Sequence, residues 1–209
     1  MFALSPATLA GQISPAMRVP DAARFAFLAI VGSAFVAVSA QLTVPLWPVP
    51  ITGQTLAVLV IGMAYGARLG AATLALYMVE GIVGIPVFAK LSAGPHVMAG
   101  PTGGYIVGFI AAAAFVGWLA ERGWSRSFTL TALAQLLGSG VIFAFGLPWL
   151  ALFYAGPGAA YVAKTGAETA FGAAIAMGFL PFLLEDLVKA ALAACLMPAA
   201  WWLVGLVRR

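Results

Sequence analysis

The chain has 209 residues, of which 64% are hydrophobic and 8% are charged, and its formal net charge is +4. Soluble domains carry about 25% charged residues, so this composition excludes a protein with an ordinary water-solvated surface. Together with a mean hydropathy of +1.07, it indicates an all-α integral membrane protein in which residues 1–209 form a single domain. The basic residues are scattered between apolar segments, which favours topology signals over a nucleic-acid-binding surface.

Residues 1–24 are expected to form a short, irregular, cytoplasmic tail. Ser, Gln and Pro interrupt its apolar residues, and no positively charged stretch precedes them as in a signal peptide. The uncharged stretch from Phe25 to Ala67 is long enough for two crossings of about 20 residues each. The prolines of the segment VPLWPVP forbid one continuous helix, so we predict spans over Phe25–Leu42 and Gln54–Gly66. The second span is short, and we expect it to be broken or shielded by its neighbours.

Glycine- and proline-rich segments or charged turns separate four further apolar segments. They predict spans over Ala71–Val83, Tyr105–Ala120, Phe128–Leu150 and Pro181–Val207, with a short surface or re-entrant helix over Thr169–Leu180. Six spans and a cytoplasmic N-terminus place the C-terminus in the cytoplasm as well, and only Lys90 and Lys164 then lie outside, in accord with the positive-inside rule. The basic residues expected on the cytoplasmic side are Arg18, Arg24, Arg68, Arg122, Arg126, Arg208 and Arg209.

Four ionisable residues lie within these apolar spans: Glu80 in the third, and Glu185, Asp186 and Lys189 in the sixth. A charge at membrane depth costs about 2.5–3.5 kcal/mol on insertion scales, so such residues usually face a bundle interior or a polar cavity. Asp186 and Lys189 are three residues apart, which places them on one helix face, in the outer third of the membrane. Glu80 lies at a similar depth, so these groups predict a polar pocket that opens to the outside.

A purely structural interpretation is open for each of these residues. Asp186 and Lys189 could neutralise each other as an ion pair without any ligand. Glu185 lies about 100° away around the helix, where it either faces lipid headgroups or is protonated. Glu80 is equally suited to a pocket wall and to a structural hydrogen bond.

The predicted pocket has a donor and acceptor set that suits a small neutral group. A carboxylate accepts N–H groups and an ammonium donates to a carbonyl, so the pair matches a urea or an amide. Aromatic residues at the same depth could supply apolar walls, and each could equally face lipid. These candidates for the walls are Trp47, Phe88, Tyr105 and Phe182.

Other kinds of site are not favoured by the sequence. The glycine-rich segment AGPTGGY precedes a predicted helix but lacks the lysine of a phosphate-binding loop, so we expect its backbone N–H groups to approach a ligand closely. His96 is the single histidine and Cys195 the single cysteine, which makes a metal site improbable. No nucleophile lies beside a base and no pair of acids converges, so we expect neither an enzyme nor a bound cofactor.

Small residues recur along the first predicted span at helical spacing: Ala22, Ala26, Ala29 and Ser33. Such stripes allow helices to approach closely, either within this bundle or against a second membrane protein.

Three segments together resemble the BioY family, the biotin-binding S components of energy-coupling factor transporters. They are VPLWPVPITGQTLAVLVIGMAYGARLGAATLALYMVEGIVGIPVF, GPHVMAGPTGGYIVGFI and EDLVKAALA, and the resemblance extends from about Ala40 to Leu192. It implies six membrane helices in the cell membrane and capture of biotin from outside. It also implies partners, namely a transmembrane coupling protein and two ATP-binding-cassette ATPases.

The resemblance also implies roles for particular residues. Asp186 and Lys189 match the family's D-x-x-K pair and should bind the ureido ring. Thr52 and Gln54 lie in the first external loop that covers the ligand, and Gly104 and Tyr105 lie at the start of the fourth span. The position of Glu80 is associated with the pocket, Lys90 is a candidate to meet the ligand's carboxylate, and the small stripe on the first span is the implied docking surface.

Three other functions remain open at this point. They are an S component for another vitamin, a secondary transporter that acts alone, and an intramembrane enzyme. The sequence also leaves open whether copies of the chain associate.

Overall fold

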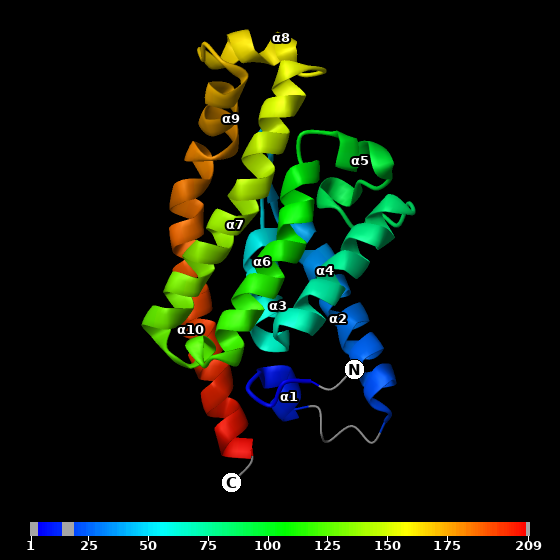
Figure 1. Cartoon of the computed structure of the whole chain (residues 1–209), viewed down its shortest axis with the longest axis vertical. Coiled ribbons are helices and arrows are strands. Elements are labelled where there is room, and N and C mark those ends of the chain that lie inside the picture. The colour runs from blue at the N-terminus through cyan, green and yellow to red at the C-terminus, as the bar shows by residue number, and fades with distance from the viewer. Residues whose placement is uncertain (1–3, 14–18, 208–209) are drawn as a thin grey trace.

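The computed structural model describes residues 4–13 and 19–207, and the chain is built almost wholly of helices (Figure 1). A helix lies over each of the six predicted spans. These helices are α2 (Asp21–Gln41), α3 (Gln54–Tyr65), α4 (Ala67–Ile82), α6 (Gly103–Glu121), α7 (Phe128–Ala155) and α10 (Leu183–Val207). Short helices connect or flank them: α1 (Leu9–Ile13), α5 (Pro95–Ala99), α8 (Ala159–Val162) and α9 (Ala170–Gly178).

Within the described ranges, four helical stretches are long and apolar enough to cross a membrane. They are Asp21–Gln41, Gly103–Glu121, Phe128–Ala155 and the run Ala170–Leu206, which joins α9 to α10. The shorter α3 packs against α4 and α6, and its Val58 and Met63 are fully buried. A helix surrounded by others in this way does not need to match the bilayer by itself, which accounts for its short length.

The connections place the loops at two ends of an elongated bundle (Figure 1). At one end, the proline-rich turn after α2 forms a small hairpin of β1 (Thr43–Val44) and β2 (Ile51–Thr52), with Thr43 paired to Thr52. At the other end, the α3–α4 turn lies against the end of α6, where the Glu121 carboxylate accepts a hydrogen bond from the Ala67 N–H at 3.0 Å. Gly66 makes that turn with a φ of 84°, a conformation that favours glycine.

Two expectations about connecting segments are resolved by the structure. The tail was predicted to be irregular, but Leu9–Ile13 forms α1, because Leu9 and Ala10 are buried and α1 contacts α3 and α10. The Thr8 hydroxyl also accepts a hydrogen bond from the Gly11 N–H at 3.2 Å. Farther along, α9 packs on α7 and leads through a short 3₁₀ turn into α10. The predicted cytoplasmic Arg18, Arg208 and Arg209 lie outside the described residues.

Candidate functional site

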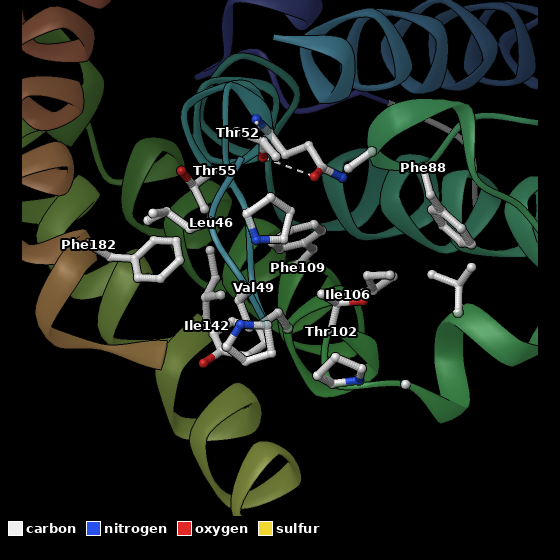
Figure 2. Close-up of a pocket in the computed structure, with 18 of the residues that line it drawn as sticks. Leu46, Val49, Thr52, Thr55, Phe88, Thr102, Ile106, Phe109, Ile142 and Phe182 are labelled. Atoms are coloured by element: carbon white, nitrogen blue, oxygen red, sulfur yellow. Dashed lines mark hydrogen bonds between the residues drawn. The ribbon is translucent and has the colours of Figure 1, made fainter. Parts of the chain in front are cut away.

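A cavity of about 370 Å³ lies between the hairpin and helices α3, α6, α7 and α10 (Figure 2). Apolar side chains form most of its wall, including Val49, Ile106, Phe109 and Ile142, while polar groups are few. This composition is typical of a site for a small organic ligand, since apolar walls supply affinity and a few polar groups set the orientation.

Most of the predicted site residues lie around this one cavity. Those that line it are Trp47, Thr52, Gln54, Phe88, Lys90, Tyr105, Phe182 and Asp186. They come from segments far apart in the chain, because the hairpin and the loop before α6 both fold over the ends of α6, α7 and α10. Glu80, Gly104 and Lys189 do not line it.

Asp186 lies in the first turn of α10 and is 7% exposed. Ser139 on α7 lies beside it, and both residues line the cavity. The carboxylate therefore supplies a polar group to a mainly apolar wall, with acceptor capacity left for a donor on a ligand.

Lys189 pairs with Glu185 and not with Asp186. Four-residue spacing stacks the two side chains on one helix face, and the ammonium also donates to the Thr52 carbonyl at 2.6 Å and to the Thr55 hydroxyl. The suggested self-neutralising pair of Asp186 and Lys189 is therefore wrong. Lys189 instead ties α10 to the hairpin and to the start of α3, beside the main cavity.

A chain of hydrogen bonds fixes the loop that covers the cavity. The Thr52 hydroxyl donates to the Gln54 side-chain carbonyl at 2.9 Å (Figure 2), and the Gln54 amide donates to the Tyr77 hydroxyl at 2.7 Å. Tyr77 in turn donates to the Val87 carbonyl at 3.0 Å. These contacts join the hairpin, α3, α4 and the loop that carries Phe88. The side chains of Thr52 and Gln54 therefore form their hydrogen bonds mainly with each other and with Tyr77.

The aromatic residues have distinct positions in the wall. Phe88 is buried edge-on against Tyr77 with the ring centroids 5.5 Å apart, and Tyr105 donates to the Gly178 carbonyl at 3.0 Å. Phe182 lies at the left edge of the labelled group (Figure 2). Trp47 is 49% exposed and its ring contacts that of Tyr161 in a tilted arrangement, with the centroids 4.0 Å apart, which places it at the rim.

Two predicted site residues are placed elsewhere. Glu80 accepts a hydrogen bond from the Ser33 hydroxyl on α2, which satisfies the acid within the bundle. Gly104 faces α7, where an added Cβ would lie 2.7 Å from the Phe145 carbonyl oxygen. Glu80 therefore contacts α2 and does not line the cavity, and the close approach at Gly104 is to α7.

The small stripe on α2 is exposed in the first turns of the helix and buried farther along it. Ala22 and Ala26 are exposed, whereas Ala29 and Ser33 are buried against the bundle. The two buried residues pack within this bundle, whereas the first turns of α2, which carry Ala22 and Ala26, leave their part of the stripe exposed.

Five polar residues that were not predicted also line the cavity: Thr55, Ser92, His96, Thr102 and Ser139. Glu185, whose position the sequence left open, lines it as well. Ser139 and Gln135 are four residues apart in an otherwise apolar span, a signal that would have indicated an inward polar face. Among the described residues, no group of three His, Cys, Asp or Glu side chains could hold a metal ion.

Comparisons with known proteins agree with a site for a small organic ligand. The chain matches the BioY family over residues 12–205. It is 36% identical over 162 residues to a Thermotoga maritima protein named biotin transporter BioY, covering 78% of this chain and 86% of that protein. It is 38% identical over 160 residues to a probable biotin transporter BioY of Pyrococcus horikoshii, covering 77% and 85%.

One solved structure shares the fold. It is a crystal structure of the S-component for biotin from an ECF-type ABC transporter, with a TM-score of 0.62 at 19% identity. The match covers 85% of this chain and 90% of that one, so the helical arrangement is common to nearly the whole of both.

Proposed function

This chain belongs to the BioY family, and from that premise we propose that it captures biotin and mediates its uptake as the S component of an energy-coupling factor transporter. The observation that carries the proposal is the mainly apolar cavity with the buried Asp186 carboxylate in its wall. Biotin combines an apolar bicyclic body with a ureido group whose N–H groups need acceptors. The cavity's volume falls within the range of about 300–1,000 Å³ that such sites have.

The proposed binding mode assigns a role to each polar residue. Asp186 accepts a ureido N–H, and Lys189 donates to the ureido carbonyl once the ligand replaces the Thr55 hydroxyl as its acceptor. The valerate carboxylate points toward Lys90 at the rim, where an exposed ammonium meets it in water-accessible surroundings. Thr52, Gln54 and Phe88 hold the loop over the bound ring.

The proposed placement in the cell membrane follows the apolar helices. Six helices cross the bilayer as one domain, with both termini in the cytoplasm and the hairpin outside. Transport requires an energy source, and in this proposal partner subunits provide it. These partners are a transmembrane coupling protein and two ATPases. Ala22 and Ala26 on the exposed face of α2 offer a close-approach surface for the coupling protein.

Equilibrium binding of biotin to the purified protein tests the proposal. Asp186→Asn and Lys189→Met are each expected to weaken binding about tenfold to a hundredfold, since each leaves a buried polar partner unmet. Cys195→Ser, an exposed position on α10, serves as the control and should bind as wild type does. Ala26→Trp should spare binding and lower cellular uptake.

Three outcomes would contradict the proposal. If folded wild-type protein binds no biotin, then biotin is not the substrate. Preference for another vitamin in competition assigns a different S component, and biotin uptake in vesicles without ATPases assigns a transporter that acts alone.

A further inference from the structure

Glu185 carries a carboxylate oxygen that nothing in the described part of the chain satisfies. Its side chain is 12% exposed, and one oxygen accepts from the Lys189 ammonium. The second oxygen is buried and has no hydrogen-bond partner among the described residues. A buried charged acceptor without a partner is costly, so such an atom is expected to be met by a donor from a ligand or from water.

Lys189 cannot provide that donor. An ammonium group has three N–H bonds, and Lys189 uses them on Glu185, the Thr52 carbonyl and the Thr55 hydroxyl. A hydrogen-bond donor for the second carboxylate oxygen of Glu185 must therefore come from the space that this side chain borders. That space is the cavity, since Glu185 and Asp186 both contribute to its wall.

We propose that Glu185 is a specificity-determining residue that accepts one ureido N–H of the ligand while Asp186 accepts the other. The inference rests on the proposed function, because it takes biotin as the ligand. Two acceptors at one end of the cavity match the two N–H groups that flank the ureido carbonyl. A ligand that presents a single N–H leaves one carboxylate unmet and is rejected for that reason.

The charges at this end of the cavity favour the same orientation of the ligand. Glu185 and Asp186 carry two formal negative charges against the single positive charge of Lys189, so a ligand's own carboxylate is repelled from this end. The neutral ureido group enters, and the carboxylate stays near Lys90, which also lines the cavity.

Calorimetric binding of three ligands to three proteins tests the assignment. The ligands are biotin and its two ureido N-methyl isomers, each of which lacks one N–H donor. The proteins are wild type, Glu185→Ala and Asp186→Ala, with Glu185→Leu as a volume-matched variant should Glu185→Ala fail to fold. In wild type, each methyl isomer should bind at least tenfold more weakly than biotin.

The expected pattern in the variants is an exchange of selectivity. In Glu185→Ala, one N-methyl isomer should bind as tightly as biotin does, while the other should still bind more weakly than biotin. In Asp186→Ala, the two isomers should exchange these roles. A merely structural role for Glu185 would lower the affinity for all three ligands equally. Both penalties surviving in Glu185→Ala or Glu185→Leu would overturn the inference, as would wild type that binds biotin and both isomers alike. Wild type that binds no biotin would instead overturn the proposed function, and this inference with it.

Discussion

At the scale of single residues, Tyr77 connects the covering loop to the bundle. It is fully buried, accepts from the Gln54 amide and donates to the Val87 carbonyl. Its ring also supports Phe88, which lines the cavity. A single hydroxyl therefore satisfies two buried groups, one at the start of α3 and one in the loop after α4, and low surrounding polarity makes each of those bonds difficult to replace.

We expect Tyr77→Phe to lower both stability and biotin affinity. The change keeps the ring but leaves a buried amide donor and a buried carbonyl without partners, at a cost of about 1–3 kcal/mol for each group. Tyr154→Phe is the matched control, because the Tyr154 hydroxyl is buried with no partner in the described structure and its loss should be neutral or stabilising. Thermal unfolding with and without biotin measures both effects, and equal shifts in the two variants would refute this account.

At the scale of elements, α3 and α6 cross at very short range. Gly62 lies at the crossing, where an added Cβ would sit 2.7 Å from the Ala113 carbonyl oxygen and 2.6 Å from a Val116 methyl group. Small residues at such crossings let backbones approach in a membrane, where packing and not the hydrophobic effect holds helices together. This contact sets the packing of α3 against α6. It thereby also sets the positions of Thr52, Gln54 and the cavity wall.

Gly62→Ala is expected to destabilise the protein although alanine is the better helix former. Overpacking costs about 1–3 kcal/mol, which exceeds the helix-propensity gain of about 1 kcal/mol. Gly140→Ala on α7 provides the comparison, because no described residue lies within 4 Å of the added Cβ and only the propensity gain remains. Opposite changes in apparent unfolding temperature are expected for the two variants. A stabilised Gly62→Ala protein would mean that the crossing is looser than described.

At the scale of the whole molecule, the two ends of the bundle differ in charge. The turn with Arg68 and the turn with Arg122 and Arg126 lie where α4 begins and α6 ends, joined by the bond from Ala67 to Glu121. Lys90 lies in the loop after α4, and Lys164 lies beside α8 at the opposite end (Figure 1). The excess of arginine at one end is the physical basis of the proposed orientation.

Cysteine labelling in intact cells tests that orientation. On a Cys195→Ser background, a cysteine at Lys164 is expected to react with a membrane-impermeant maleimide, whereas one at Ser127 should react only after the membrane is opened. Ser127 precedes α7 and leaves every arginine in place. The reverse pattern would place the hairpin and the cavity on the cytoplasmic side and remove the proposal of capture from outside.

The sequence by itself determined where the six helices of the predicted spans lie and which segments carry polar groups. Apolar length, proline and glycine breaks and charge act locally along the chain, so the six helices, the break at the proline-rich segment and the inward Asp186 follow from nearby residues. Tertiary structure alone decided which partner each polar group meets. Glu80 finds Ser33 across 47 positions, and Lys189 reaches Thr52 across 137. Local periodicity can state that a buried charge needs a partner, but only the packing of distant helices brings a particular partner within hydrogen-bonding distance.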